Sequence, residues 1–546
     1  MSDGPLYLGL DLSTQQLKAI VIQSDLHVVA EAKVSFDEDF GSKYGVEKGV
    51  LMNKAEGEVF APVAMWLESL DLVLNRLKEK NTPLNRIRGI SGSCQQHGSV
   101  YWSHKASDLL AGLTADKPLV EQLKDAFSYP YGPNWQDHST QHECDQFDVK
   151  LGSPQRLAEV TGSAAHHRFT GPQIMRLRPT SAAWTSGTSL GGDWSEPLLE
   201  LTAGGADGAA GLRRKLGEVR KDGGGSMGAI SRYFVSRYGF SADCQISPFT
   251  GDNPATILAL PLRPGDAIVS LGTSTTFLMV TPVYKPDPSY HFFNHPTTPG
   301  QYMFMLCYKN GALAREKVRD ALPGTAQAKT SGDPWAAFNA AALSTPPLDI
   351  SNPATDRAKL GLYFYLPEIV PNIRAGTWRF TSLPDGTDLR EETSSTPWPV
   401  ETDPRIIVES QALSMRLRSQ NLVYPPPDRP QLPAQPRRVY LVGGGSLNPA
   451  IARVLGDVLG GAEGVYRLDV GGNACALGGA YKALWSLERS SEAQTFDELI
   501  GQRWKEEGAI QRIGDGYREG VFEGYGKILK AFEEMEGRVL EVARNT

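Results

Sequence analysis

The stretch "YLGLDLSTQQLKAIVI", Tyr7 to Ile22, contains two apolar strands joined by a polar bend. Asp11 and Thr14 lie in the bend, and Lys18 follows on the second strand. Hydroxyls and backbone N–H groups at a tight turn can hold phosphate oxygens, an acid can orient hydrated Mg²⁺, and a lysine can neutralise phosphate charge. Taken alone, the stretch is equally compatible with an exposed hairpin tip, so both interpretations stay open at this point.

A second hairpin, "DAIVSLGTSTTFLMVTPV", repeats this layout nearly half a chain later. An apolar strand again leads into a hydroxyl-rich bend, here with Thr273 and Ser274, and a second apolar strand follows. Ser and Thr favour turns in any case, so a single hairpin of this kind carries little information. Two of them indicate two copies of one subdomain with their bends facing each other. Thr273 could then contact the other side of a phosphate chain.

The overall composition indicates a globular protein with more than one domain. A length of 546 residues predicts two or more domains, and 40% hydrophobic with 21% charged residues is ordinary for a soluble chain. The net charge of −7 argues against a nucleic-acid or membrane surface. The five cysteines have no CxxC spacing, which favours a reducing compartment and argues against a zinc cluster. We therefore expect a cytoplasmic protein that binds neither nucleic acid nor membranes.

Strand-like and helix-like segments alternate along the chain, which predicts a mixed α/β fold. Among the expected strands are "RIRGISGSC" and "SVYWS", the latter at Ser99 to Ser103. The stretch from Val59 to Lys80 has apolar residues near helical spacing and predicts one long helix. The glycine-rich stretch from Ala203 to Gly225 is typical of a solvated surface loop.

A third motif, "VYLVGGGSLNPAIARVLGDVLG", predicts a strand, a glycine bend at Gly443 to Gly445 and a helix that begins near Asn448. This arrangement commonly admits a nucleotide or an anion at the helix N-terminus. This motif is not a GxGxxG fingerprint, and the pattern GxxxxGK[ST] is absent from the chain, so a Rossmann dehydrogenase and a P-loop enzyme are both disfavoured. Further on, "VGGNACALGGAYKAL" predicts a helix start rich in small residues, for which close packing and ligand contact are equally good explanations.

The stretch "FTGDNPATI" has Asp252 and Asn253 between a glycine and a proline. Asp and Asn are frequent in type I turns, so a plain turn explains the stretch. In the alternative interpretation, Asp252 points into a cleft and accepts a proton from a substrate hydroxyl.

Polar side chains also gather in "SGSCQQHGSVYW", where Gln96 and His97 follow a predicted strand, and in "AHHRFTGPQIMRL", which contains Arg168. Such groups suit sugar hydroxyls, which need both donors and acceptors. A lone loop histidine is more often structural, and the adjacent pair His166 and His167 lacks metal-ligand spacing.

These motifs, in this order, resemble the FGGY carbohydrate kinases, and within that family its eukaryotic xylulose kinase branch. The resemblance covers nearly the whole chain, including "LGLDLSTQQLKA", "SCQQHGSVYW", "RFTGPQI", "FTGDNPA", "SLGTSTTF" and "CYKNGALAREKVRD". It implies two ribonuclease-H-like domains with a cleft between them. Residues 1–262 would form the sugar-binding domain and residues 263–546 the nucleotide-binding domain.

The resemblance also implies the reaction and the role of each residue. ATP with Mg²⁺ would phosphorylate D-xylulose on its 5-hydroxyl, with Asp252 as the base and Asp11 near the metal. The implied phosphate contacts are Thr14, Lys18 and Thr273, and the implied adenosine-side loop comprises Gly444, Gly445 and Asn448. The implied sugar contacts are Gln96, His97, Arg168, Asp252 and Asn253. Another ketose or polyol such as ribulose, or a binding protein without turnover, remains an alternative, and the chain would be a monomer or homodimer.

The chain departs from the family pattern after Pro179. The family normally carries a helix and a strand pair here; we infer that this chain lacks the helix and a strand or two, and that the family pattern resumes at Asp193. The intervening stretch, Thr180 to Gly192, is rich in Ser, Thr, Gly and Ala and has no clear period. We expect this loss from the sugar-binding domain to weaken or abolish activity, because it would uncover apolar surface and part of the cleft wall.

Overall fold

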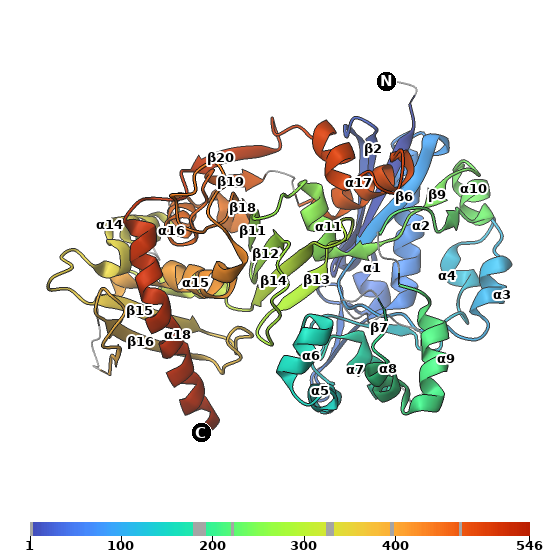
Figure 1. Ribbon diagram of the computed structural model, residues 1–546. Coiled ribbons are helices and arrows are strands. Elements are labelled where there is room, and N and C mark those ends of the chain that lie inside the picture. The colour runs from blue at the N-terminus through green and yellow to red at the C-terminus, as the bar shows by residue number, and fades with distance from the viewer. Residues whose placement is uncertain are drawn as a thin grey trace.

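In the computed structural model, the described residues are 4–177, 193–219, 223–323, 332–393, 398–468 and 472–545. Two seven-stranded mixed sheets dominate the molecule, one in each half of the chain (Figure 1). Helices cover both sheets, so the predicted mixed α/β class is confirmed. In these residues, no helix combines the length and apolar character that crossing a bilayer requires.

The N-terminal sheet is built around the first hairpin. Its strands run in the order β3-β2-β1-β6-β9-β8, and β10 pairs with β6. β1 is antiparallel to β2 and parallel to β6. The strands are β1 Leu6–Leu12, β2 Gln16–Gln23, β3 Val28–Ser35, β6 Ile87–Cys94, β8 Gly228–Ala229, β9 Gln245–Ile246 and β10 Thr250–Gly251.

The C-terminal sheet repeats the same arrangement around the second hairpin. Its order is β13-β14-β12-β11-β18-β19-β20, with β11 antiparallel to β12 and parallel to β18. The predicted internal repeat is thus confirmed at the level of strand order. The strands are β11 Ala267–Leu271, β12 Thr275–Thr281, β13 His291–Asn294, β14 Tyr302–Tyr308, β18 Val439–Val442, β19 Val465–Leu468 and β20 Ile510–Gly514.

The described residues also form two three-stranded sheets, one in each half of the chain. Their strands are β4 Leu51–Asn53, β5 Glu58–Pro62, β7 Tyr131–Pro133, β15 Ala358–Phe364, β16 Gly376–Ser382 and β17 Arg390–Glu391. The helices of the first half are α1 Phe36–Tyr44, α2 Val63–Glu79, α3 Ala106–Ala111, α4 Leu119–Gln122, α5 Gln141–Lys150, α6 Pro154–Thr161, α7 Thr170–Leu177, α8 Glu196–Ala203, α9 Ala206–Leu216, α10 Arg232–Tyr238 and α11 Asp252–Ala259. Those of the second half are α12 Ala312–Asp320, α14 Ala336–Ser344, α15 Asp403–Ser419, α16 Pro449–Leu459, α17 Ala474–Glu488 and α18 Val521–Asn545.

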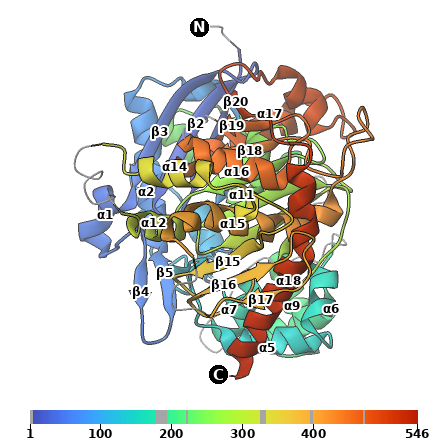
Figure 2. The same cartoon turned by 90° about the vertical axis from the view of Figure 1, so that its left-hand side faces the viewer.

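Helix α17 lies between β19 and β20 of the C-terminal sheet in the chain but packs against the N-terminal sheet, as Figures 1 and 2 show. Its glycines permit the contact: a Cβ on Gly478 would lie 1.9 Å from the carbonyl oxygen of Ala255 in α11. A Cβ on Gly479 would lie 2.7 Å from the Cα of Gly92 in β6. For these two glycines, close packing is therefore the explanation of the small-residue motif.

Three local predictions are wrong. The helix expected over Val59 to Lys80 begins only at Val63, because the preceding residues form β5 and pair with β4 and β7. Ser99 to Ser103 contributes one isolated bridge, Trp102 to Phe127, in place of a strand. The expected loop from Ala203 to Gly225 contains α9. The predicted deletion after Pro179 and the stretch from Thr180 to Gly192 lie outside the described residues.

Candidate active site

Asp11 lies near the end of β1, where the neighbouring strands place Lys18 and Ser93 beside it. The Ser93 hydroxyl donates to Asp11 Oδ1 over 2.9 Å, and the Asp11 side chain is buried. Burial raises the pKa of the Asp11 carboxyl, while the Ser93 hydrogen bond and the charge of Lys18 oppose that rise. Among the residues described, no group of three or more His, Cys, Asp or Glu side chains could by itself hold a metal ion.

The bend after β1 is closed by Ser13, whose backbone N–H donates to the Gln16 carbonyl over 2.9 Å. The Thr14 hydroxyl accepts a hydrogen bond from Trp135 Nε1 over 2.9 Å. Gly49, with a φ of +79°, passes so close that a Cβ there would lie 2.0 Å from the Thr14 carbonyl oxygen. The surrounding loops thus fix the predicted phosphate bend.

Asp252 is the first residue of α11, directly after the short strand β10 that pairs with β6. Asn253 donates to Asp252 Oδ1 twice, from its backbone N–H at 2.8 Å and from its amide at 3.1 Å. Burial raises the pKa of the Asp252 carboxyl to about 6; the Asn253 backbone bond opposes this and the charge of Asp11 adds to it. The turn expected at this position is therefore a helix N-terminus that presents a half-buried carboxylate.

The other four predicted sugar contacts, Gln96, His97, Arg168 and Asn253, lie in one cluster with Asp252. Gln96 accepts a hydrogen bond from the Asn253 amide over 3.2 Å. The His97 ring packs 4.6 Å from that of Phe169, and His97 has a φ of +75°. Burial and the charge of Arg168 lower the pKa of the His97 imidazole well below its ordinary value. Burial lowers the pKa of Arg168 as well, and the charge of Asp252 acts against that shift.

The predicted nucleotide-side residues form a second group at the end of β11 and β18. Thr273 is exposed in the bend after β11, and Gly444 has open space where a Cβ would be. A Cβ on Gly445 would lie 2.8 Å from that of Leu271, so this position requires glycine. Asn448 caps α16: its Oδ1 accepts from the N–H groups of Ala450 and Ile451, each over 3.0 Å.

Sequence reasoning missed Arg315, which lies in the first turns of α12 beside this second group. Its side chain is 1% exposed, and its Nη1 donates to Gln411 Oε1 over 2.7 Å. Its Nε and Nη2 have no hydrogen-bond partner among the described residues. Nη2 lies 3.5 Å from the position of a Cβ on Gly445, and burial lowers the pKa of the guanidinium to about 10. A buried guanidinium with free N–H groups next to a glycine loop can receive an anion.

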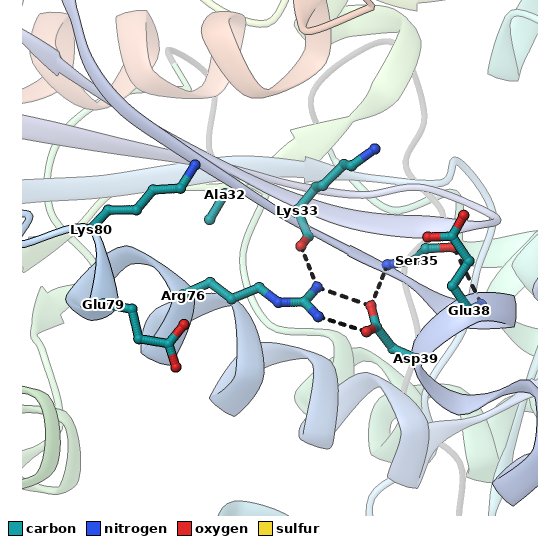
Figure 3. Close-up of a pocket in the computed structure, with 8 residues that line it drawn as sticks. All are labelled: Ala32, Lys33, Ser35, Glu38, Asp39, Arg76, Glu79 and Lys80. Carbon is teal, nitrogen blue, oxygen red and sulfur yellow. Dashed lines mark hydrogen bonds and ion pairs between the residues drawn. The ribbon is translucent and has the colours of Figure 1, made fainter.

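A separate surface pocket of ≈ 370 Å³ lies on β3, at the edge of the N-terminal sheet (Figure 3). Two of its charged residues form an ion pair: Arg76 bonds both carboxylate oxygens of Asp39, at 2.6 and 2.9 Å, and also the Lys33 carbonyl oxygen. The pairing fastens α1 and α2 to β3. We therefore interpret the residues of this pocket as structural, because they hold α1 and α2 against β3.

Comparison with solved structures defines the class of protein. The fold is similar to that of a xylulose kinase from Rhodospirillum rubrum, with a TM-score of 0.68 and 16% identity over 99% of this chain and 100% of that one. It is also similar to a glycerol kinase of Plasmodium falciparum, with a TM-score of 0.66 and 12% identity over 99% of both chains. The molecule therefore has the two-domain fold of the sugar kinases.

Sequence comparison defines the family. Residues 267–487 match the C-terminal domain of the FGGY family of carbohydrate kinases. The "Probable D-xylulose kinase A" of Aspergillus clavatus is 56% identical over 574 residues, covering 99% of each chain. The "D-xylulose kinase A" of Aspergillus niger is 55% identical over 570 residues, covering 98% of this chain and 99% of that one. The chain belongs to the FGGY family of carbohydrate kinases.

Proposed function

We propose that this chain is a D-xylulose kinase that transfers the γ-phosphoryl group of ATP to the sugar 5-hydroxyl, yielding D-xylulose 5-phosphate. The full-length similarity to the two Aspergillus proteins supports this substrate. The observation that carries the chemistry is the Asp252 carboxylate, with its pKa raised to about 6 at the start of α11. The enzyme would act in the cytoplasm as a monomer or homodimer.

Asp252 is the proposed base. Both Asn253 hydrogen bonds go to Oδ1, which fixes the carboxylate, and we assign Oδ2 to the proton of the 5-hydroxyl. A base with a pKa near 6 is ionised at neutral pH and is stronger than an ordinary aspartate. As the substrate oxygen attacks phosphorus, its proton passes to Asp252. Phosphoryl transfer otherwise requires positioning and charge neutralisation rather than a covalent intermediate.

The sugar contacts we propose are Gln96, His97, Arg168, Asp252 and Asn253. The neutral His97 and the amides of Gln96 and Asn253 offer donors and acceptors, whereas Arg168 can only donate. This mixture suits a chain of hydroxyls with one carbonyl group, as in an open-chain ketose.

For ATP, we assign Thr14, Lys18 and Thr273 to the phosphates. Gly444 and Gly445 would let the backbone approach the nucleoside, and Asn448 would hold this loop through its cap and its 2.7 Å bond to Asn339. We add Arg315 to this group, because its Nε and Nη2 have no hydrogen-bond partner among the described residues and Nη2 lies beside Gly445.

Asp11 would hold Mg²⁺ together with water and phosphate oxygens. Mg²⁺ in such sites uses one or two carboxylates and keeps several water ligands, so a single buried carboxylate fits it. When bound, the ion neutralises charge on the phosphates. Ser93 fixes the orientation of the Asp11 carboxylate through its hydrogen bond to Oδ1.

We further propose that residues 1–262 form the sugar-binding domain, that residues 263–546 form the nucleotide-binding domain, and that the former lacks a segment near residues 180–192. The alignment with the Aspergillus clavatus protein runs over 574 residues, more than the 546 of this chain, which supports a deletion. Inserting that relative's additional residues after Pro179 should raise the turnover number. A turnover number equal to that of the chain as it stands would contradict a functional loss.

The substrate is tested by following ADP release with MgATP and a panel of sugars that includes D-xylulose, D-ribulose, L-ribulose and glycerol. We expect kcat/KM to be highest for D-xylulose, and ³¹P and ¹³C NMR to place the phosphate on carbon 5. A higher kcat/KM for a ribulose or glycerol would assign the chain to a different sugar. No release with any of them would make it a binding protein.

A further inference from the structure

The strand β13, at the edge of the C-terminal sheet, contacts the N-terminal half of the chain. The backbone N–H of Phe292 donates to the Gly162 carbonyl over 2.7 Å, at the end of α6. The Tyr284 hydroxyl reaches the Glu159 carbonyl of the same helix over 2.9 Å. His291 lies within this junction, is 3% exposed, and directs both ring nitrogens at side chains of the N-terminal half.

The partners of His291 determine its tautomer. Arg168 Nη2 lies 3.1 Å from His291 Nε2, and a guanidinium can only donate, so Nε2 must be the unprotonated acceptor. The ring proton is therefore on Nδ1, 2.7 Å from Ser163 Oγ, which accepts it. The Ser163 hydroxyl donates onward to the Ala164 carbonyl over 2.9 Å. Burial lowers the pKa of the His291 imidazole well below its ordinary value, which agrees with a neutral ring.

The hydrogen bonds that join Arg168, His291 and Ser163 form a relay. This relay fixes the orientation of the Arg168 guanidinium, which has few other restraints. Within the described part of the chain, no carboxylate lies within ion-pair distance of Arg168. Cys307 and the Asp252 carboxylate act on its charge from a longer distance, and the guanidinium carbon lies 6.0 Å from the Phe169 ring centroid. Because Nη2 is bound to His291, the other N–H groups of the Arg168 guanidinium remain available to a ligand beside Asp252.

We propose that His291 is a positioning residue of the sugar site, and that it holds Arg168 in the orientation that receives a sugar oxygen. The inference rests on the proposed function, in which Arg168 contacts the sugar. A strand of the C-terminal sheet thereby completes a site that otherwise comes from the N-terminal half. Sugar affinity then depends on how the two sheets are placed relative to each other.

Two variants distinguish the contact made by Nε2 of His291 from the contact made by its Nδ1. In His291→Gln the amide reaches the place of Nε2 and can accept from Arg168, whereas in His291→Asn it ends near Nδ1 and reaches only Ser163. We expect His291→Asn to raise the KM for D-xylulose about tenfold, the cost of a lost hydrogen bond to a charged group. His291→Gln should recover most of that loss. The KM for ATP and the melting temperature should change little in both.

Equal KM values for D-xylulose in wild type and His291→Asn would overturn the proposal. A purely structural role would instead raise the KM for D-xylulose and the KM for ATP equally and lower the melting temperature, in His291→Asn and in His291→Gln alike. That result would also overturn the proposal. If the wild type releases no ADP with D-xylulose, the proposed function fails instead. Long-range ¹H–¹⁵N NMR of the imidazole, assigned by its loss in His291→Gln, tests the relay independently. It should show the Nδ1–H tautomer, and an Nε2–H or charged ring would contradict the proposal.

Discussion

The ammonium group of Lys18 lies 2.6 Å from the carbonyl oxygen of Gly472, although the two residues are 454 positions apart in the chain. Lys18 belongs to β2 of the N-terminal sheet, and Gly472 precedes α17, which packs on the same sheet. The lysine assigned to the phosphates is therefore held by the segment that returns from the C-terminal sheet. This contact links the first hairpin to the segment that leads from β19 of the C-terminal sheet to α17.

Lys18→Met removes the cation while leaving the strand apolar. We expect kcat with D-xylulose to fall about 100-fold, the typical cost of removing one group that stabilises transition-state charge. Lys54→Met, at an exposed position on the same half of the chain, is the matched control and should retain activity. Retained activity in Lys18→Met would remove Lys18 from the phosphate site.

The raised pKa of Asp252 has a cost in stability that can be measured. Its value is about 6 in the folded protein, against 3.8 for an ordinary aspartate, so the folded state binds a proton that the unfolded state has lost between these pH values. Stability therefore falls as pH rises through this window, and the penalty is complete above pH 6. Asp252→Asn should raise the free energy of unfolding by about 1–2 kcal/mol at pH 8, with little effect at pH 4.

Urea unfolding at both pH values measures this difference. Asp243→Asn, which removes one exposed negative charge, is the control for the change in net charge. The same stabilisation by Asp252→Asn at pH 4 and pH 8 would show that burial of the charged carboxylate is not its source.

Gly478→Ala tests the contact between α17 and the helix that carries Asp252. The added Cβ would meet the Ala255 carbonyl oxygen at 1.9 Å, so one of the two helices must move. We expect a loss of about 1–3 kcal/mol of stability and a lower kcat, because α11 positions the base. Gly537→Ala in α18, where a Cβ meets nothing within 4 Å, should be neutral or slightly stabilising. An unchanged kcat in Gly478→Ala would show that α11 does not transmit the shift to Asp252.

Arg315→Met tests the nucleotide side. Losing the buried guanidinium should raise the KM for ATP about tenfold and leave the KM for D-xylulose unchanged, because the free N–H groups lie beside Gly445. Lys317→Met, on the exposed face of the same helix, should alter neither value. A melting temperature that falls without a change in the KM for ATP would instead give Arg315 a structural role.

Much of the fold could be predicted because the two hairpins are local features. The apolar strands on either side of Asp11 and of Thr273 are contiguous in sequence, and their repetition predicts matching sheets. The start of α2 could not be predicted, because Phe60 is held in a strand by its pairing with Pro133, far along the chain. The apolar stretch around Tyr101 indicates a strand, yet it is a buried loop in which Tyr101 is completely covered.

The residues of the candidate site also divide into some that the sequence predicts and some that it does not. Asp252 and Asn253 stand next to each other, so their motif predicts them without knowledge of the fold. His291 and Arg315 could not be predicted: "YHFFNH" and "LAREKVR" resemble an ordinary strand and a solvated helix. Their significance comes from burial and from partners at Arg168 and Gln411, which only the tertiary structure brings near.

The most direct test of the account compares wild type with Asp252→Asn for ADP release from MgATP, with and without D-xylulose. We expect release by the wild type only when the sugar is present. In Asp252→Asn it should fall about 1,000-fold, as expected for loss of a general base, while calorimetry still detects binding of D-xylulose. Release that does not depend on the sugar, or a rate in Asp252→Asn close to that of the wild type, would contradict the assignment of Asp252 as the base of a D-xylulose kinase.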